Sequence, residues 1–163
     1  MKDRRLLVVA VALALVFSAV WLWRAAGDQS TSRTTVPAGQ TGRLGAVTYR
    51  LDSLQALART PTRYDEPVIP ADGAVLVLAR ISYDAAGTTT FFSCTFELVA
   101  GETTWSSEFG YFPPEPDSSS CPPDTAGTVA VLFEIPARSV QQVQGIAVVN
   151  PGSTEPILSG TPA

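Results

Sequence analysis

Apolar and polar residues alternate with a period of two in several separate stretches of the chain. These stretches are Val47–Leu51, Val75–Tyr83, Phe92–Leu98 and Val129–Ile135, with further short apolar runs at Val143–Asn150 and Ile157–Ser159. Successive side chains of a β-strand point to opposite faces of a sheet, so this alternation predicts strands that bury one face. Turn-forming residues separate the stretches, as in Pro70–Gly73 and around Gly87 and Gly101. The pattern therefore predicts an all-β, antiparallel two-sheet sandwich over residues 43–163.

One of these stretches is apolar on both faces. In Val75–Tyr83 the alternating residues Val75, Val77, Ala79 and Ile81 are interleaved with Leu76 and Leu78. A strand with two apolar faces must be covered on both sides to keep them from water. We therefore expect this strand to be central in its sheet.

A different pattern precedes the strands. Leu6–Trp23 is a block of 18 residues in which only Ser18 is polar. As a helix it spans about 27 Å at about 1.5 Å per residue, close to the roughly 30 Å core of a bilayer. Lys2, Arg4 and Arg5 lie before the block, which places the N-terminus in the cytoplasm by the positive-inside rule. We predict a cytoplasmic tail at residues 1–5, an uncleaved transmembrane signal anchor at 6–23, and an extracellular domain on a single-pass protein of the cell membrane.

The alternative for this block is a cleavable signal peptide, because Ala25, Ala26 and Gly27 offer small residues for a cleavage site. Both readings export the domain, and cleavage would make it a secreted protein. Residues 24–42 are rich in Ser, Thr and Gly and have no apolar period, which predicts a flexible linker between the block and the domain.

Composition excludes several kinds of chemistry. The chain has no histidine, and Lys2 is its only lysine. Catalysis by a histidine base, zinc bound by histidine and Schiff-base chemistry in the exported part are therefore ruled out. From Asp28 onward, 14 acidic residues stand against 7 arginines. This acidic balance argues against nucleic-acid binding, because a phosphate backbone would be repelled.

Cys94 and Cys121 are the only cysteines. In an oxidising compartment a single pair usually forms a disulfide, and we expect this bond to tie the loop at residues 110–124 to the strand that contains Cys94. A reactive thiol is the alternative, but neither cysteine has a basic neighbour in the sequence.

The loop at residues 110–124 is the one segment whose composition suggests binding. It combines the aromatic residues Tyr111 and Phe112 with the acidic residues Glu115 and Asp117. These four residues are the candidate interaction site, for a partner protein, a sugar or a cation, against the alternative of a plain solvated loop. The loop lacks the regular oxygen spacing of a calcium site, so we expect no metal and no cofactor.

A carboxylate pair for glycoside hydrolysis is a further hypothesis. Glu102, Glu108 and Glu115 are its candidates, but such a pair needs a fixed separation across a cleft. Small sandwiches rarely contain a deep cleft. We therefore assign no catalytic residues and expect the protein not to be an enzyme, with a small hydrolase as the least favoured alternative.

The order of these elements resembles a known family. The predicted elements follow one another in this order: an anchor, a Ser/Thr-rich linker, a long apolar strand after Pro70–Gly73, the strand Phe91–Leu98 and the run Phe133–Pro136. This order resembles the telokin-like, immunoglobulin-fold domain of unknown function in exported proteins of Gram-positive bacteria, and is similar to secreted mycobacterial immunoprotective antigens with the same sandwich. The resemblance implies an immunoglobulin-like fold over residues 43–150 and no catalytic residues.

These observations lead to one expectation about function. We expect a membrane-anchored extracellular domain that interacts with another protein of the bacterial cell envelope. Binding of a small ligand or carbohydrate through the 110–124 loop is the alternative.

Overall fold

The computed structural model describes residues 16–18, 33–64, 66–88, 94–108, 110–114, 116–149 and 155–163. The chain divides into two compact units, Met1–Ser32 and Arg33–Ala163. Within the described part of the chain, no helix has the length and apolar character needed to cross a membrane. Of the predicted anchor at 6–23, only residues 16–18 are described, and they are helical. The rest of that prediction lies outside the described residues.

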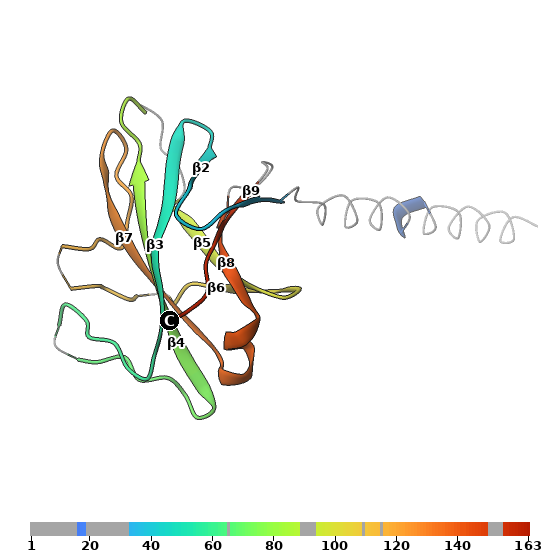
Figure 1. Cartoon of the computed structure of the whole chain (residues 1–163), viewed down its shortest axis with the longest axis vertical. Helices are drawn as coiled ribbons and strands as arrows, with labels where there is room; N and C mark the ends of the chain where they lie inside the picture. The colour runs from blue at the N-terminus through green and yellow to red at the C-terminus, as the bar shows by residue number, and fades with distance from the viewer. Residues whose placement is uncertain are drawn as a thin grey trace, which may run out of the picture. The chain divides into compact units, whose positions relative to one another are not determined.

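The second unit is built from β-strands. They are β1 (Arg33–Val36), β2 (Thr41–Leu44), β3 (Val47–Leu57), β4 (Ala74–Asp84), β5 (Thr95–Ala100), β6 (Thr103–Ser106), β7 (Ala126–Pro136), β8 (Val143–Val149) and β9 (Glu155–Ser159). A short 3-10 helix, η1 (Ala137–Gln142), joins β7 to β8. One sheet has the order β1-β9-β8-β5-β6 and the other the order β2-β3-β4-β7. We call them sheet A and sheet B (Figure 1).

The two sheets enclose one main core, as a sandwich requires. Its largest fully buried side chains include Tyr49, Ile81, Phe96, Phe133 and Ile146, which come from both sheets. The rings of Tyr49 in sheet B and Phe96 in sheet A meet edge to face, with centroids 6.0 Å apart. The predicted all-β, two-sheet architecture is therefore confirmed, and its named strand pairs are antiparallel except β1 with β9.

The prediction that Val75–Tyr83 is central is also confirmed. This stretch forms β4, which pairs with β3 on one side and β7 on the other. Val77 and Ile81 face the main core. Leu76 and Leu78 are equally buried, but they belong to a second apolar cluster on the opposite face of sheet B. Both faces of the strand are covered, as its two-sided apolar pattern requires.

The folded unit begins earlier than predicted. The linker was expected to extend to residue 42, but Arg33–Val36 and Thr41–Leu44 are strands. β1 pairs in parallel with β9, and β2 pairs antiparallel with β3. A side chain at Gly42 would clash with Leu158, because its Cβ would lie 2.9 Å from Leu158 Cδ2. The Ser/Thr/Gly-rich composition that suggested a flexible linker instead supports short strands held by backbone hydrogen bonds.

Other boundaries differ in detail. β6 (Thr103–Ser106) was not predicted, because four residues are too few to show a period. β5 begins at Thr95, and its residues Phe96 and Leu98 are buried as expected. Phe92, at the start of the predicted stretch, lies outside the described residues. β8 corresponds to the predicted strand at Val143–Asn150, of which Asn150 is not described.

Candidate interaction surface

The outer face of sheet B is divided into an apolar half and a polar half. The apolar half carries the second cluster, Leu76, Leu78, Ala130 and Leu132, with the half-buried Leu57. The polar half carries Arg50, Asp52, Arg80, Ser82 and Thr128, which the strand register places side by side. Water can cover only the polar half without cost. The apolar half must be covered by other parts of the chain.

Two connecting segments provide that cover. The first is residues 58–73, between β3 and β4, where Thr60 and Val68 exchange two backbone hydrogen bonds of 3.1 and 2.9 Å. The second follows β6 and contains the 110–124 loop. Its Glu108 N–H donates to the carbonyl of Leu132 on the outer edge of β7, over 2.7 Å. The two segments thus lie over the same half of sheet B.

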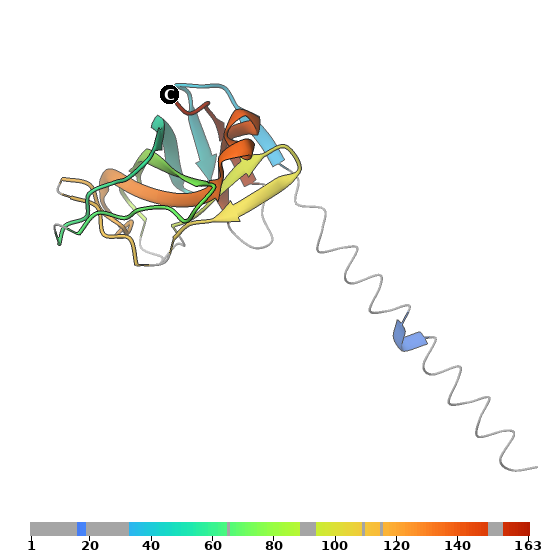
Figure 2. The ribbon, with the colours of Figure 1, turned by 90° about the horizontal axis from the view of Figure 1, so that it is seen from below.

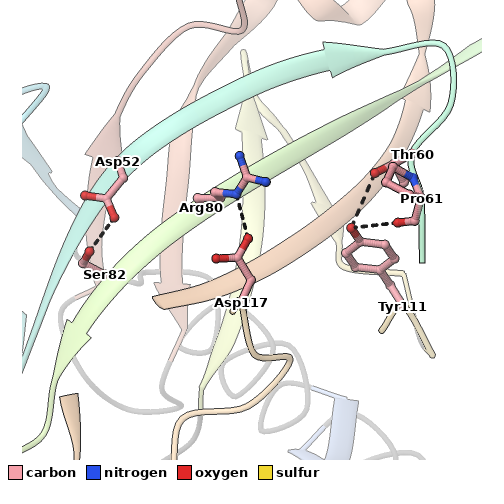
Figure 3. Close-up of polar contacts among 7 residues, drawn as sticks. All are labelled: Asp52, Thr60, Pro61, Arg80, Ser82, Tyr111 and Asp117. Carbon is pink, nitrogen blue, oxygen red and sulfur yellow. Dashed lines mark hydrogen bonds and ion pairs between the residues drawn. The ribbon is translucent and has the colours of Figure 1, made fainter. Parts of the chain in front are cut away.

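Tyr111 contacts the first segment from the second, and its ring packs on the outer face of sheet B. Its side chain is only 8% exposed and packs in the second cluster with Leu76 and Leu132. Its hydroxyl lies 3.5 Å from both the Thr60 hydroxyl and the Pro61 carbonyl (Figure 3). Tyr111 was predicted to contact a partner, but the structure buries it, because the apolar outer face of sheet B needs a large side chain to cover it.

Asp117 also has an internal role. Its carboxylate accepts a hydrogen bond of 2.7 Å from Nε of Arg80, and its side chain is 13% exposed (Figure 3). The next residue, Ser118, bonds to both Thr128 and Ala130 on the outer edge of β7. Asp117 therefore fastens the loop to the sheet. Glu115, the other acidic candidate, lies outside the described residues.

Phe112 is the predicted site residue that reaches solvent. Its side chain is 42% exposed, and its carbonyl accepts a 3.0 Å hydrogen bond from the Arg63 N–H of the first segment. Its ring packs edge to face on Tyr64, with centroids 5.7 Å apart, and Tyr64 is itself 67% exposed. We call this pair of rings the aromatic surface. Arg63 is also exposed beside it.

The sequence pattern did not single out Tyr64. It lies in a segment with no alternation, between Pro61 and Pro67, and a single aromatic residue there has no periodicity to interpret. The usable signal was an aromatic residue between two prolines, outside every apolar stripe. The aromatic surface lies at the side of the domain away from β1 and β9, as two perpendicular views show for the segments that carry it (Figures 1 and 2).

The polar half of the outer face satisfies its charges internally. Nε of Arg50 lies 2.8 Å from Oδ1 of Asp52, and Asp52 also accepts a hydrogen bond from the Ser82 hydroxyl (Figure 3). Arg80 is paired with Asp117 as described above. A neighbouring cavity of about 180 Å³ is lined by Thr41, Thr48, Arg50 and Asp84 among others. These contacts join neighbouring strands of sheet B to one another and to the 110–124 loop.

Cys94 and Cys121 lie at disulfide distance, with their Cα atoms 5.8 Å apart, and they are separated by 27 positions in the sequence. Cys94 precedes β5 of sheet A, and the buried Cys121 precedes β7 of sheet B. A bond between them would link the two sheets as well as the loop. A nearby contact strengthens this corner, because the Gly87 N–H donates to the Asp124 carboxylate over 2.8 Å.

Carboxylates are the side chains of this chain that could support catalysis or bind a metal ion. Glu102 and Glu108, two of the three carboxylates considered for hydrolysis, are exposed. Within the described part of the chain, no group of three or more Cys, Asp or Glu side chains is positioned to hold a metal ion. Burial in the core raises the pKa of Tyr49 to about 12.

Comparisons with known proteins add no relative. No family model matches the sequence, and no curated protein or solved structure is similar to it.

Proposed function

We propose that the chain is a membrane-anchored, extracellular interaction module of the bacterial cell envelope, and that the aromatic surface binds a partner protein. The proposal includes an immunoglobulin-like fold for residues 33–163 and no enzymatic activity. Four groups of observations support it.

Strand order supports the immunoglobulin-like fold. Seven strands from β3 to β9 can be lettered A, B, C, C′, E, F and G in chain order. The order β3-β4-β7 then corresponds to A-B-E, and β9-β8-β5-β6 corresponds to G-F-C-C′. These are the neighbours expected in the two sheets of an immunoglobulin sandwich. The same strand order is what the resemblance to telokin-like domains of exported Gram-positive proteins would require.

The segment between β6 and β7 stands where strand D would lie in that scheme. It covers the outer edge of β7 through Glu108 and Ser118, but only at isolated points. An irregular segment at an edge blocks sheet-to-sheet aggregation and leaves its side chains free to vary. Phe112 is carried on this segment, which supports a role in recognition rather than in folding.

Location at the cell envelope is supported by the apolar block and the cysteines. Leu6–Trp23 follows Lys2, Arg4 and Arg5, as a signal anchor with a cytoplasmic N-terminus requires. A cysteine pair at disulfide distance is typical of exported proteins. Since β1 begins at Arg33, only residues 24–32 would connect the anchor to the domain, a reach of at most about 30 Å.

The observation that carries the proposal is the exposure of Tyr64 and Phe112 on two segments that are hydrogen-bonded to each other. Large aromatic side chains in water cost free energy, and protein interfaces are enriched in Tyr, Phe and Arg. The backbones that carry the two rings are joined by the Arg63–Phe112 hydrogen bond, and Tyr111 is buried in the second cluster, so less backbone ordering would be needed on binding. The surface also lies away from Arg33, where a membrane anchor would attach.

Photo-crosslinking in intact cells tests the proposal. A benzophenone amino acid replaces Phe112 in one strain and Thr103, an exposed residue on β6, in a control strain. We expect irradiation to trap a discrete envelope protein, identified by mass spectrometry, from position 112 and not from 103. Identical products from both positions, or none from 112, would contradict the proposal.

A further inference from the structure

The aromatic surface is an open corner between two rings. The ring planes of Tyr64 and Phe112 lie at 73° to each other with centroids 5.7 Å apart, and the two side chains are 67% and 42% exposed. The face of an aromatic ring is negative, and a cation placed over it is attracted. Two exposed rings at a steep angle form two walls of the kind of aromatic cage that binds ammonium groups. The geometry of the pair therefore suits a positively charged group.

The charge of the two segments that carry these rings favours the same kind of group. Residues 58–73 and 107–125, which connect β3 to β4 and β6 to β7, together contain seven acidic residues and two arginines, a net charge of −5. All other residues of 28–163 contain seven acidic residues and five arginines, a net charge of −2. The negative charge of residues 28–163 is therefore concentrated on the segments that carry the aromatic surface.

Two exposed glutamates lie on the same segments as the rings. Among the residues that the structure describes, neither the Glu66 nor the Glu108 carboxylate is in an ion pair. The Thr62 hydroxyl donates to the Glu66 carbonyl over 2.8 Å and accepts from the Tyr64 N–H over 3.2 Å, so Glu66 shares a turn with Tyr64. Glu108 is held through its N–H, which donates to the Leu132 carbonyl. Both side chains therefore remain available to a cation.

Two arginines of the first segment oppose this negative charge but do not reverse it. Arg59 and Arg63 are both exposed, and Arg63 directly precedes Tyr64. Charges on neighbouring segments act together over a screening length of about 8–10 Å in physiological salt. The sum of the charges sets the sign of the field that an approaching partner meets. Seven acidic residues against two arginines make that sum negative, which favours a basic partner over an acidic one.

We propose that the aromatic surface takes a basic segment of its partner, with a lysine or arginine side chain placed against the Tyr64–Phe112 pair. This rests on the proposed function, because it specifies the chemistry of the partner that the same surface binds. Contact of the cation with the rings supplies attraction at short range. The acidic residues of the two segments supply attraction at longer range, which guides the partner to the surface and selects against acidic partners.

A pair of synthetic peptides tests the charge of the ligand. A Gly-Arg repeat peptide and a Gly-Glu repeat peptide of the same length are titrated into full-length protein, labelled with ¹⁵N and held in a non-ionic detergent. We expect the basic peptide to shift the amide signals of Tyr64 and Phe112, with a Kd that rises at least about fivefold between about 50 and about 500 mM NaCl. The acidic peptide should shift neither signal. Equal shifts by both peptides, or binding that leaves both signals unmoved, would overturn the inference.

Charge reversals locate the attraction. Glu66→Lys and Glu108→Lys change glutamates on the segments that carry the rings, and Glu102→Lys makes the same change at an exposed residue between β5 and β6. Affinity for the basic peptide should fall about threefold in each of the first two variants and clearly less in the third. Equal losses in all three would assign the attraction to total charge and overturn the inference. Glu66→Gln and Glu108→Gln, with smaller expected losses, replace any lysine variant that does not fold.

Ring removal tests the short-range contact. Tyr64→Leu and Phe112→Leu keep an apolar side chain but remove the aromatic face. The affinity for the Gly-Arg peptide should therefore fall about two- to fivefold in each variant. Unchanged affinity in both variants would show that the rings do not receive the cation.

Crosslinking in cells separates this inference from the proposed function. A partner trapped from position 112 with a yield that Glu66→Lys does not lower would overturn the basic ligand and leave the proposed function standing. Binding of the Gly-Arg peptide at Tyr64 and Phe112, with no partner trapped from position 112, would support the basic ligand and contradict the proposed function.

Discussion

Tyr111 and Phe112 are neighbours in the sequence, but the structure assigns them opposite roles, and this difference can be measured. We consider the replacement of each by alanine, together with Tyr111→Phe. Tyr111 is 8% exposed and lies in the second cluster, whereas Phe112 is 42% exposed and contacts Tyr64 edge to face. Tyr111→Ala therefore opens a cavity over the outer face of sheet B, and Phe112→Ala does not.

The structure sets the size of each effect. Truncation of a buried aromatic residue costs roughly 3–5 kcal/mol, and we expect about 3 kcal/mol for Tyr111→Ala because it lies under surface segments that can partly collapse. The Tyr111 hydroxyl contacts are 3.5 Å long, at the limit for hydrogen bonds, so Tyr111→Phe should cost less than about 0.5 kcal/mol. Phe112→Ala loses one exposed aromatic contact, at most about 1 kcal/mol.

Urea denaturation followed by far-ultraviolet circular dichroism measures these differences. With a slope of about 2 kcal/mol per molar urea, Tyr111→Ala should lower the midpoint by roughly 1.5 M, and the other two variants by less than about 0.5 M. Binding of the proposed partner in cells should respond differently. We expect it to be weakened by Phe112→Ala and unchanged by Tyr111→Phe. Equal destabilisation by the two alanine variants would refute the division of the pair into a structural and an exposed residue.

Three other predictions concern the core and the cysteines. Phe133→Ala removes a fully buried ring and should lower the free energy of unfolding by about 3–5 kcal/mol. Glu134→Ala loses one hydrogen bond, which its carboxylate accepts from the Ala71 N–H, and should cost about 1 kcal/mol. Equal urea midpoints for the two variants would show that the register of β7 is wrong. A bond between Cys94 and Cys121 should contribute up to about 3.5 kcal/mol to the free energy of unfolding. Its reduction should raise the hydrogen-exchange rate around Cys121 before that of β4. Two free thiols in protein taken from the envelope would exclude the bond. Because burial raises the pKa of Tyr49 to about 12, above its ordinary value near 10, the unfolded chain ionises first and stability should fall between pH 10 and 12, by up to roughly 2–3 kcal/mol. Tyr49→Phe should flatten this alkaline loss in thermal unfolding, and an unchanged loss would assign it to other groups.

The candidate site was only partly predictable. The aromatic and acidic composition of the 110–124 loop directed attention to the segment that carries Phe112, one of the two rings of the proposed aromatic surface. It could not separate Phe112 from Tyr111, because a loop has no fixed period that assigns alternate residues to opposite faces. Tyr64 and Phe112 are 48 positions apart, and nothing local indicates that their rings meet.

The sequence by itself determined the strands with long alternation, the central position of Val75–Tyr83 and the exclusion of histidine chemistry. Each of these follows from local periodicity or from composition, which do not depend on how the strands are arranged. The tertiary structure decided the start of the fold at Arg33, the role of Asp117 as the partner of Arg80, and the pairing of Ala163 with Leu54 and Ala56 on the edge of β3. These features arise from backbone and side-chain partners far apart in the chain, and short Ser/Thr/Gly-rich strands gain their stability only from such partners.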